Sequence, residues 1–139
     1  MIASVPTGPV PERLDRFLRG AHPAVVATVL SDGAPVSVAT WYLWQGDRFM
    51  ISMEAGRLRA RTLAHDPRVA LTVLGEDWYD SVSLRGRVVE LRRDPDRTDL
   101  DAISHHYRGV PYPRDTPFDA LTAIVAVDSW HEFVSATRT

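Results

Sequence analysis

Three arginines alternate along a short segment that follows a glycine: Arg57, Arg59 and Arg61 come after Gly56. The segment is rich in helix formers, and Asp66-Pro67 would end the helix. A helix N-terminus has unpaired backbone N–H groups and a positive dipole, so it favours anions and disfavours each cation by about 0.3–1 kcal/mol. Three arginines at this end indicate either a bound phosphate group or a solvated arginine face in a protein without lysine.

The basic side chains of the chain are unusual in kind but not in number. All 16 of them, in 139 residues, are arginines, so any phosphate contact by a basic side chain involves a planar and permanently charged guanidinium. The net charge of −2 is too close to neutral for a general nucleic-acid binder, which needs many phosphate contacts. Nucleic acid is therefore not an expected partner.

Few other residues have the types and spacing of a catalytic or metal-binding site. The absence of cysteine excludes disulfides, thiol catalysis and a zinc-thiolate site. His105 and His106 are adjacent on a predicted helix, so they point about 100° apart, and no third ligand is near them in sequence. We therefore predict no metal site. The chain has no nucleophile–base constellation, and we expect no catalytic side chain.

The bulk composition is that of a globular protein, with 45% apolar and 24% charged residues, and we expect a single domain over residues 1–139. The N-terminus lacks the basic and apolar regions of a signal peptide. The longest apolar run, Ala24 to Leu30, is too short to span a membrane. These features predict a cytoplasmic protein with no membrane partner.

Strands should outnumber helices. Apolar, β-branched runs bounded by turn signals predict six strands, at residues 24–30, 36–44, 48–53, 68–74, 81–92 and 121–127, with a short edge strand in the tail 129–136. Helices are expected from Pro11-Glu12 to a stop at Gly20, over 57–65, and from Asp94–Asp96 to about Tyr107. Gly86, inside the fifth strand, predicts a bulge or a close backbone approach.

These elements predict a mainly β fold with short helices. Short turns join most of the strands, so an antiparallel sheet closed into a barrel is the simplest architecture. The helix at 57–65 interrupts that barrel between its third and fourth strands.

The segment from Gly56 to Leu71 resembles the signature of the pyridoxamine 5'-phosphate oxidase-like split-barrel flavoproteins. In that family a basic segment of the form R-x-K-x-R-N-L, followed by D-P-R-V, binds the cofactor phosphate. Other motifs agree in order and spacing, namely Asp32-Gly33-x-Pro35, Leu84-x-Gly86-x-Val88 and Tyr107-x-Gly109. The resemblance covers about Pro11 to Asp128. It is strongest to the B group of flavin/deazaflavin oxidoreductases, many of which use coenzyme F420.

The resemblance implies a set of cofactor-binding residues. Arg57 and Arg59 would hold the cofactor phosphate, Arg59 standing where the family usually has lysine, and Thr62 replaces the usual asparagine. Ser52 would lie beside the phosphate, and Arg61 would meet the carboxylates of the F420 tail. The residues expected under the cofactor ring are Val38, Ala39 and Thr40. Trp78, with Tyr79, would either wall the cofactor cleft or pack in the protein or at a dimer seam.

The motifs of the true pyridoxamine-phosphate oxidases are not matched. Their second-strand arginine is replaced by Val38, their Tyr-Thr pair by Ser52-Met53, and their Arg-Lys pair by Leu58-Arg59. Their C-terminal R-x-H-x-R substrate motif is absent from the tail Ser129–Phe133. The resemblance therefore implies a different substrate and weaker binding of FMN.

The resulting prediction is a split β-barrel homodimer with cofactor clefts at the subunit interface. It would transfer a hydride from reduced F420 to a small conjugated acceptor, with the deazaflavin supplying the chemistry. Two alternatives remain. One is the same chemistry with FMN, and the other is a non-enzymatic binder of flavin or of haem, with His105 or His131 as haem ligands.

Overall fold

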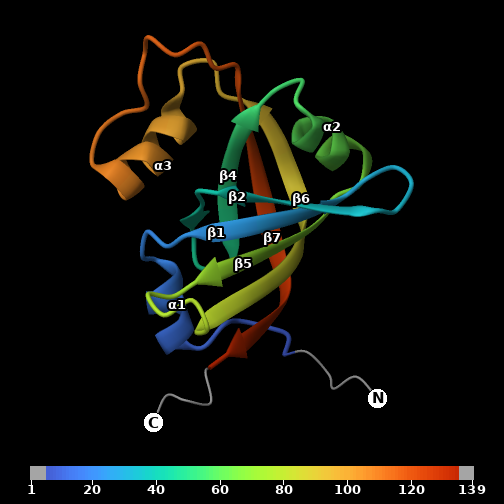
Figure 1. Ribbon diagram of the computed structural model, residues 1–139, viewed down its shortest axis with the longest axis vertical. Helices are drawn as coiled ribbons and strands as arrows, with labels where there is room; N and C mark the ends of the chain where they lie inside the picture. Colours follow the sequence, from blue (N-terminus) through green and yellow to red (C-terminus); the bar gives the residue numbers. More distant parts are fainter. Residues whose placement is uncertain (1–5, 135–139) are drawn as a thin grey trace.

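The computed structural model describes residues 6–134 of the chain. One antiparallel sheet contains all seven strands of this part, in the order β2-β1-β5-β6-β7-β4-β3. In Figure 1, β1, β2 and β5 cross the nearly vertical β4, β6 and β7, so the sheet curls strongly along its order. The elements are α1 (Glu12–Leu18), β1 (Ala24–Val29), β2 (Pro35–Thr40), β3 (Leu43–Trp44), β4 (Arg48–Glu54), α2 (Leu58–His65), β5 (Arg68–Leu74), β6 (Ser81–Arg93), α3 (Thr98–Arg108) and β7 (Ala120–Phe133).

The fold is thus mainly β with three short helices, as predicted, but the strand expected over residues 36–44 is divided into two, β2 and β3. The chain leaves β2 at Thr40 and re-enters the sheet only as the two-residue β3. Tyr42 lies at this break, where its side chain is fully buried and its hydroxyl donates to the Leu18 carbonyl at 2.8 Å. Trp41 stacks on Tyr107 with ring centroids 5.0 Å apart. These aromatic contacts fix the segment outside the regular ladder.

The predicted separate strand in the tail is wrong. Its described part continues β7, which pairs with β6 along its whole length and is interrupted by bulges. Residues 135 and 136 of the prediction lie outside the described residues. At one bulge a Cβ on Gly86 would stand 1.9 Å from the Ala126 carbonyl oxygen, so only glycine allows this approach of the two backbones. The predicted bulge or close approach at Gly86 is confirmed.

Two apolar clusters flank β4, because successive side chains of a strand point to opposite faces. Phe49, Ile51 and Met53 belong to the main core, which includes the buried residues of α1, β1 and β5. Met50 packs with Ile103 of α3 in a smaller cluster on the other face. Helix α2 contacts β1 and β4. The end of β4 therefore lies between the two helices that follow it in sequence.

Helix α3 begins later than the sequence predicts. Asp94 is buried and lies outside the helix, and its carboxylate accepts hydrogen bonds from the backbone N–H groups of Asp99 (3.2 Å) and Leu100 (3.0 Å). Arg97 adopts a left-handed conformation with φ of 59°, which delays the first turn to Thr98. Across residues 6–134, no helix is long and apolar enough to cross a membrane.

Candidate cofactor cavity

A cavity of about 660 Å³ opens at the end of the molecule where α2 begins. Three segments form its walls: the β1–β2 hairpin, the end of β4 with the start of α2, and the loop between α3 and β7. The lining residues are Thr28, Val36, Ser37, Val38, Met53, Glu54, Arg57, Leu58, Arg59, Tyr112, Thr116, Pro117 and Phe118.

The N-terminus of α2 faces this cavity through Arg57 and Leu58. Gly56 turns the chain with a φ of +88°, a conformation that favours glycine, and Arg57 then takes the position before the helix. The Arg57 side chain makes no capping hydrogen bond within residues 6–134, and the first turn of α2 contains no acidic residue. The helix thus keeps the orphan N–H groups and the positive dipole that favour an anion.

Arg59 is half-buried, and the backbone of β4 holds its side chain in place. One nitrogen of its guanidinium, Nη2, donates to the backbone carbonyl of Ser52 at 3.2 Å. The other, Nη1, is buried and has no hydrogen-bond partner among the described residues. Burial lowers the pKa of the Arg59 guanidinium, which nevertheless keeps its charge. A half-buried cation that lines a cavity and has a donor without a partner is suited to an anionic ligand.

Arg57 is arranged differently. Its side chain is 76% exposed, and its Nε donates to the Glu54 carboxylate at 3.1 Å. Both partners line the cavity. Arg57 and Arg59 therefore present one guanidinium that is ion-paired near the solvent and one that is buried with a free donor.

The β2 wall is apolar, and it contains one of the three residues expected beneath the ring. Val38 lines the cavity and is 48% exposed, and Val36 and Ser37 lie beside it. Ala39 and Thr40 do not line the cavity, and the Thr40 hydroxyl donates to the Trp41 carbonyl at 3.0 Å. Of these three residues, Val38 therefore lines the cavity with Arg57 and Arg59, whereas Ala39 and Thr40 do not.

Ser52 and Thr62 lie near the arginines without lining the cavity. Ser52 contacts Arg59 through its carbonyl oxygen, while its hydroxyl is buried without a partner among the described residues. The Ser52 side chain shares a face of the sheet with Thr122, whose hydroxyl donates to Asp99 at 2.7 Å. The Thr62 hydroxyl donates to the Leu58 carbonyl at 2.7 Å within α2.

Arg61 and Trp78 also lie outside the lining. Arg61 is exposed on α2, one turn after Arg57, and its N–H donates to the Arg57 carbonyl at 3.2 Å. Trp78 is 64% exposed in the loop between β5 and β6, where it stacks on Tyr79 at 4.0 Å. This loop lies at the opposite end of the molecule from α2 (Figure 1), so the structure does not bring Trp78 to the arginines within one chain.

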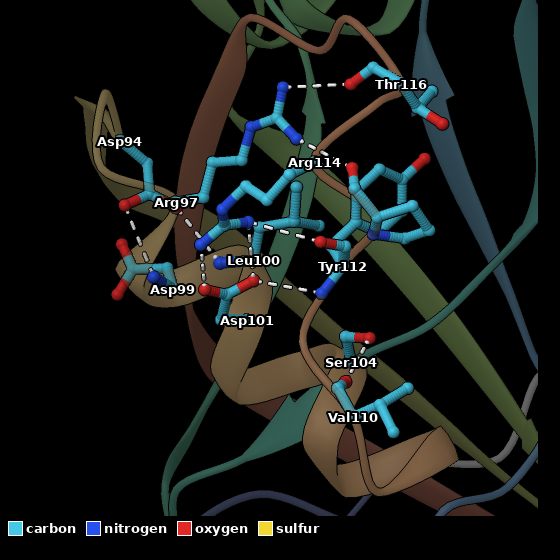
Figure 2. A network of polar contacts seen from close by, with 11 residues as sticks. Asp94, Arg97, Asp99, Leu100, Asp101, Ser104, Val110, Tyr112, Arg114 and Thr116 are labelled. Atoms are coloured by element: carbon cyan, nitrogen blue, oxygen red, sulfur yellow. Dashed lines mark hydrogen bonds and ion pairs between the residues drawn. The ribbon is translucent and has the colours of Figure 1, made fainter.

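The loop of residues 109–119 supplies the third wall, and a polar network holds it against α3 (Figure 2). Arg97 donates to the carbonyls of Pro113 and Thr116, both at 3.0 Å. Asp101 accepts from the Tyr112 N–H at 3.0 Å and pairs with Arg114. The cavity wall is thus positioned by the first turn of α3.

Sequence reasoning missed the cavity residues of this loop, chiefly Tyr112 and Phe118, whose rings lie 5.2 Å apart. The prolines of the segment indicated only a connection between elements. One available signal was the pair of aromatic residues spaced among them, since aromatic side chains in a rigid loop commonly form a binding wall.

A second cavity of about 890 Å³ lies at the α1 end of the molecule. Its charged lining consists of Arg13 and four carboxylates, those of Glu76, Asp77, Asp80 and Glu132. Arg13 is ion-paired with Glu132. Neither His105 nor His131 lines either cavity, and residues 6–134 contain no group of three or more acidic or histidine side chains placed to hold a metal.

The curled antiparallel sheet, with a basic helix inserted between β4 and β5, has the architecture of a split barrel. The sequence model of the pyridoxamine 5'-phosphate oxidase family matches residues 10–129, and the chain belongs to that family.

Solved structures agree with this assignment. An F420 reductase is 25% identical and superposes with a TM-score of 0.80, over 88% of this chain and 98% of its own. A conserved hypothetical protein from Mycobacterium tuberculosis is 19% identical, with a TM-score of 0.73 over 94% of this chain and 89% of its own. An FAD- and haem-binding protein from Mycobacterium smegmatis is 24% identical, with a TM-score of 0.68 over 94% and 73%. No curated protein matches the sequence.

Proposed function

We propose that the α2-end cavity binds coenzyme F420 and that the protein transfers a hydride from its reduced form to a small conjugated acceptor. The observation that carries this proposal is the half-buried Arg59 in the cavity lining, whose Nη1 is buried and has no partner in the described part of the chain. The F420 reductase with 25% identity supports the choice of cofactor.

In this proposal Arg57 and Arg59 bind the cofactor phosphate together with the N-terminus of α2. The guanidinium of Arg59 approaches from inside the cavity and that of Arg57 from the solvent side. Arg61, one turn further along α2, meets the carboxylates of the tail that extends beyond the phosphate.

The apolar walls orient the ring. Val36 and Val38 on one side and the aromatic residues of the 109–119 loop on the other suit a flat heterocycle, and they exclude water from it. When bound, reduced F420 supplies the hydride, so no catalytic side chain is required.

The cofactor preference is the direct test. Val38 and Ser52-Met53 replace residues that bind FMN in the oxidases of the family. We therefore expect F420 to bind at least about tenfold more tightly than FMN, a difference of about 1.4 kcal/mol in binding free energy. Calorimetry at moderate salt measures both affinities, and absorbance follows oxidation of reduced F420. FMN that co-purifies in stoichiometric amount, or equal affinities, would contradict the F420 assignment. A Soret band in the purified protein would favour haem instead.

We also propose that the protein is a homodimer with clefts shared between subunits. Apolar side chains are exposed at Val38 and Leu58 beside the cavity and at Trp78 and Tyr79 at the far end. A second subunit that covered them would complete the cleft, and Trp78 of one chain could then reach the other. Sedimentation should give about twice the monomer mass of 15.5 kDa at micromolar concentration. A clean monomer would contradict both the dimer and the shared cleft.

A further inference from the structure

The α2-end cavity contains an acidic side chain where a phosphate-binding site would be expected to avoid one. Glu54, the last residue of β4, lines the cavity together with Arg57 and Arg59. Its carboxylate lies 3.1 Å from Arg57 Nε. Any phosphate that binds Arg57 therefore lies close to this carboxylate as well. Because like charges repel, the carboxylate weakens the binding of that phosphate.

The three charged side chains of the lining carry two positive charges and one negative charge. Their sum of one positive charge balances a phosphodiester, which carries a single negative charge. A phosphomonoester carries about −1.5 to −2 at pH 7, because its second pKa is about 6. No further cationic side chain of the lining balances this additional charge, and Glu54 repels it.

We propose that Glu54 selects the charge of the bound phosphate group, favouring a singly charged phosphodiester over a doubly charged phosphomonoester. This inference rests on the proposed function, because it concerns the same cavity and arginines. The phosphate of F420 is a diester and that of FMN a monoester, so Glu54 would be a specificity-determining residue that acts by repulsion.

The size of the effect follows from the charges. The repulsive energy is proportional to the ligand charge, so removing the carboxylate helps a dianion about twice as much in free energy as a monoanion. A gain of about threefold in affinity for a diester would then correspond to about tenfold for a monoester. Release of Arg57 from its ion pair adds to both gains.

The experiment uses Glu54→Gln, which keeps the shape of the side chain and removes its charge. Calorimetry compares F420, FMN and the methyl ester of FMN, which has the same ring as FMN but one phosphate charge fewer. We expect E54Q to strengthen FMN binding by about tenfold and binding of the methyl ester and of F420 by about threefold each.

The matched control is Asp119→Asn. Asp119 pairs with Arg93 outside the cavity lining, and its carbonyl accepts from the Ala55 N–H at 2.9 Å, so it lies near Glu54 in the fold. D119N should leave all three affinities within about twofold, because exposed charges are screened. Equal changes for FMN and its methyl ester in E54Q, or no gain for FMN, would overturn the inference. Failure of the wild type to bind F420 would contradict the proposed function instead, and the FMN pair would still report on Glu54.

Discussion

The two cavities of the molecule are similar in scale and opposite in charge. The α1-end cavity is the larger, at about 890 Å³ against about 660 Å³. Its one arginine, Arg13, is ion-paired with Glu132, and three further carboxylates line it. In the α2-end cavity two arginines face one carboxylate, and Arg59 retains a buried donor without a partner in the described residues.

The volume of a cavity alone therefore does not identify an anion-binding site. Arg13 shares its cavity with four carboxylates, which repel a phosphate, while the half-buried Arg59 has lost hydration that a ligand can replace. The α2 end is therefore the site that an anionic cofactor should prefer.

The largest effect is expected from replacing the buried arginine. Arg59→Ala removes a charge-assisted hydrogen bond worth about 1.5–3 kcal/mol, which corresponds to a loss of about 10- to 150-fold in F420 affinity. Arg13→Ala, the matched change in the α1-end cavity, should alter that affinity by less than about twofold. Calorimetry measures both. The comparison of cavities fails if R13A weakens binding as much as R59A does.

A smaller effect is expected from the 109–119 loop, which lines the α2-end cavity but not the α1-end cavity. Arg97→Ala removes two hydrogen bonds, to the carbonyls of Pro113 and Thr116, and should cost about 1–2 kcal/mol of stability. We expect F420 affinity to fall about threefold, because the wall formed by Tyr112 and Phe118 is held less firmly. Hydrogen exchange should rise in residues 109–119. Unchanged exchange there would show that Arg97 does not position the wall.

Arg61 should contribute less again, and only through the tail of the cofactor. Arg61→Ala should weaken binding of F420 by about twofold, with the difference vanishing at high salt because the contact is exposed and screened. F420 lacking its glutamate tail should bind wild type and R61A equally. An equal loss for both forms of the cofactor would place Arg61 at the phosphate.

We expect the smallest effect from acidification, which removes the charge of Asp101 and so its contribution to stability. Hydrogen bonding and charge from Arg114 hold the pKa of Asp101 below its usual value. The stability from this pairing is therefore present above the ordinary pKa of about 3.9 and is lost as pH falls through the lower folded value. Thermal unfolding of Asp101→Asn and wild type should differ at pH 7 and converge toward pH 2. A gap that persists in acid would show that the Asp101 charge is unimportant.

The position of α2 could be predicted from the sequence because its signals are local. Gly56 before the arginines and Asp66-Pro67 after them mark both ends of the helix, and the structure has α2 at Leu58–His65. The motifs of the segment also led to the correct family. Local chain conformation and short motifs are encoded by neighbouring residues, so a single sequence is sufficient to read them.

The break at Trp41-Tyr42 and the 109–119 wall could not be predicted, because contacts distant in sequence determine them. Tyr42 is fixed by the Leu18 carbonyl, and Tyr112 by the carboxylate of Asp101. Glu54 shows no pattern in sequence that marks it as a cavity residue. Its role depends on the turn at Gly56, which brings Arg57 back to the carboxylate.

The pairing of β4 with β7 has a consequence for how the chain folds. Its register joins Arg48 to Ala126 and Glu54 to Ala120, and within residues 6–134 the only other strand that pairs with β4 is the two-residue β3. During synthesis the apolar strand β4 leaves the ribosome long before β7 exists, and such distant pairings form slowly. The barrel therefore closes only after β7 has been made, and a nascent chain that stops before residue 120 exposes an edge of β4 to other chains.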